Sequence, residues 1–252
     1  MTIIEALGLA VAAFVAGGIN AVAGGGSLVS FPALLAIGYP AKVANITNTV
    51  ALWPGYLGGS IGYRALLIPQ RQRILVLSIS AVLGAIAGAA VLLLTSEAAF
   101  RAIVPYLILF AAALLAFQVR LTALIARFRR AAGGGGVPIE LHGPMFLLGV
   151  YGAYFGAGLG TMTLAALSIL MPDDLQRSNA LKGMLSLVIN AVAVAVFAFS
   201  GYVEWPAAAI MAVAALAGGY AGVGLARRLS AATLRTLVVA YSVIVALVLL
   251  VR

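Results

Sequence analysis

The sequence predicts an all-α polytopic membrane protein, and two observations lead to that class. Hydrophobic residues make up 64% of the 252-residue chain and charged residues only 8%, against about 25% charged residues in soluble domains. Apolar stretches recur along the whole chain, and a helix needs about 20 apolar residues to cross a bilayer. The length therefore accommodates about eight to ten membrane segments, and no alternating apolar and polar pattern indicates an outer-membrane barrel.

The charge balance and the rare residues exclude several classes of function. Fifteen Lys and Arg residues stand against six Asp and Glu residues, so the net charge is 15 − 6 = +9. In a membrane protein this excess first indicates orientation in the bilayer, and we expect no nucleic-acid partner. The chain has no Cys and a single His, His142. We therefore expect no disulfide, no thiolate chemistry, no metal centre and no cofactor.

The first apolar stretch is too long for one straight membrane helix. Residues 4–36 would span about 50 Å at about 1.5 Å per residue, whereas the hydrocarbon core of a bilayer is about 30 Å thick. Gly24-Gly25-Gly26 lies in the middle of this stretch. We expect the helix to be broken or re-entrant there.

The sequence repeats itself at an offset of 134 residues. The identical residues that align under this offset without a gap include Gly18/Gly152, Gly24/Gly158, Gly26/Gly160, Asn45/Asn179, Gly84/Gly218, Gly88/Gly222, Ser96/Ser230, Arg101/Arg235 and Val104/Val238. We expect two homologous halves, residues 1–119 and 144–252, joined by a basic Gly-rich linker, residues 120–143. The second half then carries its own helix break at Gly158–Gly160.

The cations indicate how the two halves are oriented. With four crossings in each half, the cations divide eight to seven between the two faces of the membrane. If the breaks turn the chain back, each half has five segments and the division is ten to five, which is the bias that the positive-inside rule describes. We therefore predict inverted repeats with both termini outside the cytoplasm. The minority face then carries Lys42, Arg101, Arg177, Lys182 and Arg252.

The two glycine-rich breaks are candidate anion sites. A helix that begins after a break presents free N–H groups and a positive dipole end, which suit a small oxyanion. Two such helix starts approaching from opposite faces converge near the membrane midplane, where transporters bind substrate. The alternative, that small residues only allow close helix contact, is preferred for Gly84/Gly88 and Gly218/Gly222.

Polar residues follow each break and begin the next predicted segment. Asn45 and Asn179 are equivalent, and for both of them helix stitching or capping is slightly favoured over ligand contact. Lys182 is equivalent to Asn48. Inside the bundle its ammonium needs an anion, whereas at a helix start it snorkels to the interface, and both interpretations stay open. All six acids fall at predicted segment ends, so no carboxylate is placed for a proton relay within the membrane.

Two stretches of the chain resemble a known family. GGINAVAGGGSLVSFPALLAIGYPAKVANITNTVAL with PGYLGGSIGYR is similar to the first half of the TauE/SafE sulfite exporter family, and GAYFGAGLGTMTLAALSIL with SNALKGMLSLVINAVAVAVF is similar to its second signature. The resemblance covers nearly the whole chain. It implies a multi-pass inner-membrane transporter of small sulfur anions, such as sulfite, thiosulfate or sulfonates. The absence of a Walker A motif agrees with a secondary carrier.

We therefore expect secondary transport of a small anion, a sulfur oxyanion or an organosulfonate such as sulfoacetate or a taurine-like compound, by alternating access. The alternatives are a transporter or channel for a different small solute and, with less support, a membrane enzyme or a scaffold subunit. The expected partners are the anion and the lipid bilayer, and a homo-oligomer stays open. The expected substrate-binding residues are Gly24, Gly25, Gly26, Ser27, Asn45, Thr47, Asn48, Gly158, Gly160, Thr161, Asn179 and Lys182.

Overall fold

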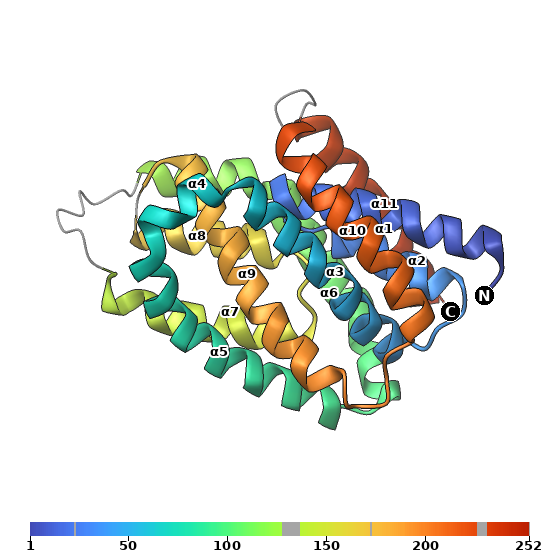
Figure 1. Ribbon diagram of the computed structural model, residues 1–252. Helices are drawn as coiled ribbons and strands as arrows, with labels where there is room; N and C mark the ends of the chain where they lie inside the picture. Colours follow the sequence, from blue (N-terminus) through green and yellow to red (C-terminus); the bar gives the residue numbers. More distant parts are fainter. Residues whose placement is uncertain (23, 128–136, 172, 226–230, 252) are drawn as a thin grey trace.

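The protein is helical throughout the part of the chain that the computed structural model describes, residues 1–22, 24–127, 137–171, 173–225 and 231–251, and these residues contain no strand (Figure 1). The helices are α1 (Ile3–Val22), α2 (Ser27–Ala36), α3 (Ala41–Gly62), α4 (Arg64–Leu67), η1 (Ile68–Gln70), α5 (Arg71–Leu94), α6 (Glu97–Arg127), η2 (Ile139–Leu141), α7 (His142–Tyr154), α8 (Leu159–Leu170), α9 (Leu175–Phe197), α10 (Trp205–Leu225) and α11 (Ala231–Val251).

The predicted membrane class is confirmed by helix length and hydropathy. Within the described ranges, five helical stretches are long and apolar enough to cross a bilayer: Ile3–Ala21, Arg64–Leu94, Glu97–Phe117, Leu175–Phe197 and Trp205–Gly222. The outer faces of these helices are apolar. On α5, Leu75, Ile79 and Leu83 are exposed at four-residue spacing, which places them on one side of the helix. Such a continuous exposed apolar face suits contact with lipid.

The helix starts repeat at the offset found in the sequence. Helices α3, α5 and α6 begin at residues 41, 71 and 97, and α9, α10 and α11 begin at residues 175, 205 and 231. Each pair differs by 134: 41 + 134 = 175, 71 + 134 = 205 and 97 + 134 = 231. Helix α6 continues to Arg127, into the predicted linker, and the linker residues Arg129, Arg130 and Gly133–Gly136 lie outside the described residues. The inverted orientation of the halves stays a prediction.

Small residues bring helices of opposite halves into close contact. Helix α1 packs on α10, and the equivalent helix α7 packs on α5. A Cβ added at Gly84 of α5 would overlap the backbone oxygen of Phe146, and one added at Gly218 of α10 would overlap that of Phe14. The interpretation of these glycines as helix-contact residues is therefore supported by the packing.

One end of the bundle, which we call the Lys42 end, is held together by Lys42. Its Nζ donates to the backbone oxygens of Leu93 and Thr95, each at 2.8 Å, at the end of α5. Its backbone N–H donates to Glu97 Oε2 at 3.0 Å, at the start of α6. Helix α1 begins and α11 ends at this same end of the bundle (Figure 1). The two ends of the described chain thus lie at one end of the bundle, as any even number of membrane segments requires.

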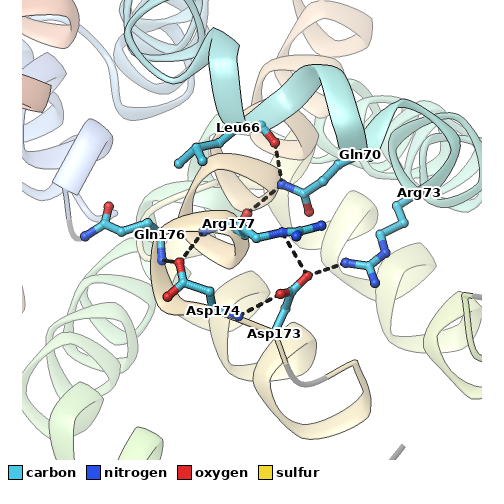
Figure 2. A network of polar contacts seen from close by, with 7 residues as sticks. All are labelled: Leu66, Gln70, Arg73, Asp173, Asp174, Gln176 and Arg177. Carbon is cyan, nitrogen blue, oxygen red and sulfur yellow. Dashed lines mark hydrogen bonds and ion pairs between the residues drawn. The ribbon is translucent and has the colours of Figure 1, made fainter. Parts of the chain in front are cut away.

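The opposite end, which we call the Arg73 end, joins the first half to the loop between α8 and α9 (Figure 2). Asp173 pairs with Arg73 of α5 and with Arg177 of α9. Gln70 Nε2 donates to the backbone oxygens of Leu66 and Arg177 at 2.8 and 3.1 Å. These contacts correct one sequence assignment: Arg177 lies at the same end as Arg73, not on the opposite face, because α8 returns the chain to the end where α5 begins.

Candidate functional site

The first break lies between α1 and α2 and is closed by a side chain from α1. Gly24 has φ +74°, a left-handed conformation that glycine adopts at little cost. The backbone N–H groups of Gly25 and Gly26 donate to Asn20 Oδ1 at 3.1 and 2.7 Å. The donors that the sequence assigned to an anion are therefore occupied by a carboxamide in this conformation.

The second break lies between α7 and α8 and lacks that carboxamide. The residue before α8 is Gly158, which has φ +76° and supplies no side-chain cap. The position equivalent to Asn20 is Tyr154, since 20 + 134 = 154. A tyrosine there carries no amide to accept the first N–H groups of α8. The two breaks thus share their backbone geometry at Gly24 and Gly158 and differ in how the following helix start is capped.

The two breaks touch each other. A Cβ added at Gly24 would lie 2.7 Å from Gly160 Cα, and one added at Gly160 would lie 2.9 Å from Gly24 Cα. Both distances are shorter than real Cβ contacts, so the contact requires glycine on both sides. The predicted convergence of the two helix breaks is therefore present as a direct backbone contact between the halves.

Lys182 lies beside this contact, about two turns into α9. The site for a Cβ on Gly160 is 3.4 Å from Lys182 Cδ, so the aliphatic part of the lysine packs against the start of α8. The side chain is 1% exposed, and its Nζ has no hydrogen-bond partner among the residues that the structure describes. Of the two alternatives drawn from the sequence, the structure places Lys182 inside the bundle, with no snorkelling to an interface.

The two lysines of the chain are both buried and differ in their partners. Lys42 is 4% exposed, and its ammonium donates to two backbone oxygens and lies 4.5 Å from the ring centroid of Tyr202. Lys182 has none of these contacts. A buried ammonium is normally paired or hydrogen-bonded, so Lys182, unpartnered within the described residues, stays a candidate for ligand contact.

Asn45 and Asn179 each join α3 or α9 to the end of a broken helix in the opposite half. Asn45 Nδ2 donates to the backbone oxygen of Tyr154, the last residue of α7, at 2.9 Å. Asn179 Nδ2 lies 3.5 Å from the backbone oxygen of Ala21 in α1 and donates to the hydroxyl of Tyr63 at 3.1 Å. These contacts support the stitching interpretation for both amide nitrogens.

Thr47 and Asn48 are neighbours in α3 with different surroundings. The hydroxyl of Thr47 accepts a hydrogen bond from the backbone N–H of Glu204 at 3.0 Å, which ties α3 to the loop before α10. Asn48 is 2% exposed, and its Oδ1 has no partner within the described part of the chain. Asn48 is equivalent to Lys182, so the repeat places an unsatisfied polar group at the same point of α3 and α9.

The remaining predicted residues line the two helix starts. Gly25 has φ +114° and lies against Leu115 of α6. Ser27 is the first residue of α2 and Thr161 lies in the first turn of α8, both buried. Whether any of the twelve residues binds substrate stays a prediction.

Sequence reasoning omitted two residues from the site. Asn20 caps the first break, and its position four residues before Gly24 in the sequence was the available signal. Ser186 lies four residues after Lys182, on the same face of α9. It is 1% exposed, and its hydroxyl has no partner among the described residues.

The candidate site is therefore a polar centre with one basic side chain, Lys182, in an apolar bundle. It combines an ammonium, the start of α8 and several uncharged polar groups, without a carboxylate. Within the described residues there is no group of three or more His, Cys, Asp or Glu side chains that could hold a metal ion. This chemistry suits reversible binding of a small anion, since ammonium and backbone N–H groups both donate to oxyanions.

Comparison with known proteins gives a consistent result. The family model described as "Sulfite exporter TauE/SafE" matches residues 9–249. The chain is 27% identical to a "Probable membrane transporter protein" of Haemophilus influenzae over 229 residues, covering 91% of this chain and 88% of that relative. It is 26% identical to "Probable membrane transporter protein ORF9" of Sinorhizobium sp over 250 residues, covering 96% and 91%. No solved structure matches the chain.

Proposed function

Since the chain belongs to the TauE/SafE sulfite exporter family of membrane transporters, we propose that it is a secondary carrier of a small sulfur oxyanion or organosulfonate. The observation that carries the proposal is the ammonium of Lys182, which is buried beside the start of α8 without a partner among the described residues. The family indicates that the protein is a membrane transporter, and the unpartnered ammonium of Lys182 supports an anionic substrate.

The charge argument rests on the surroundings of Lys182. An unpaired ammonium in a protein interior costs several kcal/mol, and a bound anion offsets much of that cost. The six acids of the chain are Glu5, Glu97, Glu140, Asp173, Asp174 and Glu204. None of them lies within the central turns of a described helix. No carboxylate of the protein is therefore placed as the counter-ion of Lys182, and an anionic substrate takes that place.

The contact between the two breaks supports alternating access. Gly24 and Gly160 belong to opposite halves and touch at the candidate site. Each broken helix pair also packs on the other half, α1 on α10 and α7 on α5. Rocking of one half against the other would therefore separate the breaks and expose Lys182 to one side of the membrane at a time.

Flux measurements on purified protein in liposomes test the proposal. We expect saturable uptake of at least one of sulfite, thiosulfate, sulfoacetate and taurine, and loss of that uptake in Lys182→Met. The matched control is Lys42→Met, which removes the other lysine and leaves the affinity of the folded protein for the anion unchanged. Absence of flux for all four compounds, or undiminished flux in Lys182→Met, would overturn the proposal.

A further inference from the structure

A small cavity lies between α1, α3 and α9, next to the first break. Its volume is about 10 Å³, which is room for about one water molecule. The lining residues come from the end of α1, the second half of α3 and the first turns of α9: Asn20, Ala21, Gly55, Tyr56, Gly59, Ser60, Tyr63, Asn179, Ala180 and Gly183.

Three buried polar atoms of this lining have no hydrogen-bond partner within the described residues. They are Asn20 Nδ2, Ser60 Oγ and Asn179 Oδ1, and their residues are 3%, 9% and 9% exposed. Buried polar side-chain atoms are normally satisfied by protein or water. Three unsatisfied atoms from three different helices around one cavity therefore indicate a space that takes a polar occupant.

The cavity lies between the candidate anion site and the Arg73 end of the bundle. Asn179 precedes Lys182 by three residues, about 4.5 Å along α9, toward the end where α9 begins. Tyr63 lies at the end of α3 and is followed by Arg64, an exposed cation. A basic surface at this end raises the local concentration of anions.

The walls of the cavity leave space that a side chain would fill. A Cβ added at Gly183 would meet no atom within 4 Å. Two of the lining residues contact each other, because Asn179 Nδ2 donates to the Tyr63 hydroxyl at 3.1 Å. This hydrogen bond between α9 and the end of α3 is weak enough for thermal motion to open.

We propose that this cavity is the collapsed segment of the substrate pathway between Lys182 and the Arg73 end, and that the Tyr63–Asn179 hydrogen bond closes it. In the open state it holds water and the small oxyanion on its way to or from Lys182, with Asn20 Nδ2 and the Ser60 hydroxyl as donors. The inference deepens the proposed function and rests on it, because the pathway serves the anion bound at Lys182.

The natural absence of cysteine allows a direct test. Ser60→Cys places one thiol in the cavity with little change in size, and a membrane-impermeant methanethiosulfonate carrying a sulfonate group reports whether water reaches it. We expect labelling in liposomes, and labelling at least threefold faster when Tyr63→Phe is added. The matched control is Ser30→Cys, because Ser30 is fully buried with its Oγ bonded to Gly26 O at 3.4 Å. If Ser60→Cys reacts no faster than Ser30→Cys in both backgrounds, the inference is wrong.

A second pair of variants tests the pathway by blocking it. Gly183→Leu fills the cavity, and we expect labelling of Ser60→Cys to fall at least tenfold. Where the wild-type protein carries anion, the flux should fall with it. Gly8→Leu is the control, because Gly8 lies in α1 with open space around it. Labelling without flux contradicts only the proposed function, whereas flux without labelling contradicts only this inference.

Discussion

The two broken helix pairs have a left-handed glycine at equivalent positions, Gly24 and Gly158, and differ in the side chains around the new helix start. In α1–α2 the break at Gly24 is followed by N–H groups that donate to Asn20 Oδ1. In α7–α8 the equivalent break at Gly158 has Tyr154 in place of that asparagine, and the ammonium of Lys182 lies beside the new helix start. Asn20 thus caps the first break, whereas the second break has no such side-chain cap and the N–H of Leu159 donates to the backbone oxygen of Gly156 at 3.1 Å.

This difference shows how two repeated halves can acquire different chemistry at equivalent positions. Duplication alone would give two equal helix starts facing each other across the Gly24–Gly160 contact. A carboxamide caps the first helix start and an ammonium lies beside the second, which favours the second half for the proposed anion site. Equivalent positions 48 and 182 show the same division, with Asn48 in α3 and Lys182 in α9.

The largest effect is expected at Lys182. Lys182→Met should weaken anion binding by about 2–5 kcal/mol, because removing one member of a buried charge pair leaves the other uncompensated. The ligand-free protein should become more stable by about 1–4 kcal/mol, since an unpaired buried charge is replaced by an apolar side chain of similar length. Thermal unfolding with and without thiosulfate measures both changes. A loss of stability together with unchanged binding would mean that Lys182 is structural.

The next largest effect is the difference in stability between the alanine variants of Gly24 and Gly158. Alanine at either position costs about 1–2 kcal/mol for the left-handed backbone. At Gly24 the added Cβ also overlaps Gly160, at 2.7 Å, whereas at Gly158 it meets Ala111 at an ordinary 3.5 Å. Gly24→Ala should therefore destabilise the protein by about 1–3 kcal/mol more than Gly158→Ala. Equal melting temperatures for the two variants would show that the breaks do not touch.

Asn20→Ala should remove the cap of the first break. Two buried N–H groups lose their acceptor, which costs about 1–3 kcal/mol of stability. The freed N–H groups are then available to an anion at the first break, so thiosulfate should raise the melting temperature of Asn20→Ala more than that of the wild type. An identical anion-induced shift in both proteins would contradict the role given to Asn20.

The smallest effect concerns the loop after α8, which the ion pair between Asp173 and Arg73 joins to α5. The position equivalent to Asp173 is Tyr39, since 173 − 134 = 39. Burial raises the pKa of Asp173, but the backbone N–H of Asp174 and the charged side chains of Arg73 and Arg177 bring this pKa below its usual value. Its contribution to stability is thus present above the unfolded pKa of about 3.9 and is lost as the pH falls through the folded pKa.

Asp173→Asn tests this anchor. We expect it to lower stability by about 1 kcal/mol at neutral pH, since the ion pair is only partly buried. The difference from the wild type should disappear at low pH, in thermal unfolding measured across a pH series. Tyr39→Phe is the control at the equivalent position and should show no such pH dependence. A constant difference at every pH would contradict the assignment.

The sequence was sufficient for the class, the helix starts and the positions of the breaks. Hydropathy predicts the membrane helices, and the offset of 134 residues predicts that the helix starting at 41 has a counterpart starting at 175. Paired glycines predict the contacts of Gly84 and Gly218, because small residues pack closely in membranes. These features depend on local composition and spacing, which a single sequence carries.

The polar contacts could not be predicted from the sequence, because they depend on which side chains of the two halves meet. Asn20 is an ordinary residue in the sequence until the chain turns back at Gly24 and brings two N–H groups to its carboxamide. The placement of Arg177 was wrong because the loop after α8 returns to the Arg73 end. The sequence left open whether Lys182 lies inside the bundle or at the membrane interface. The answer depends on how the helices pack, because a lysine two turns into a helix can reach the interface only if its side chain is not covered.

The anion affinities of Lys182→Met and Asn20→Ala show which of the two breaks binds the anion. Titration calorimetry of purified wild type, Lys182→Met and Asn20→Ala with the transported sulfur anion gives three dissociation constants. We predict that binding is lost in Lys182→Met and kept in Asn20→Ala. Binding that survives in Lys182→Met and is lost in Asn20→Ala would place the anion at the first break and contradict the site proposed for this transporter.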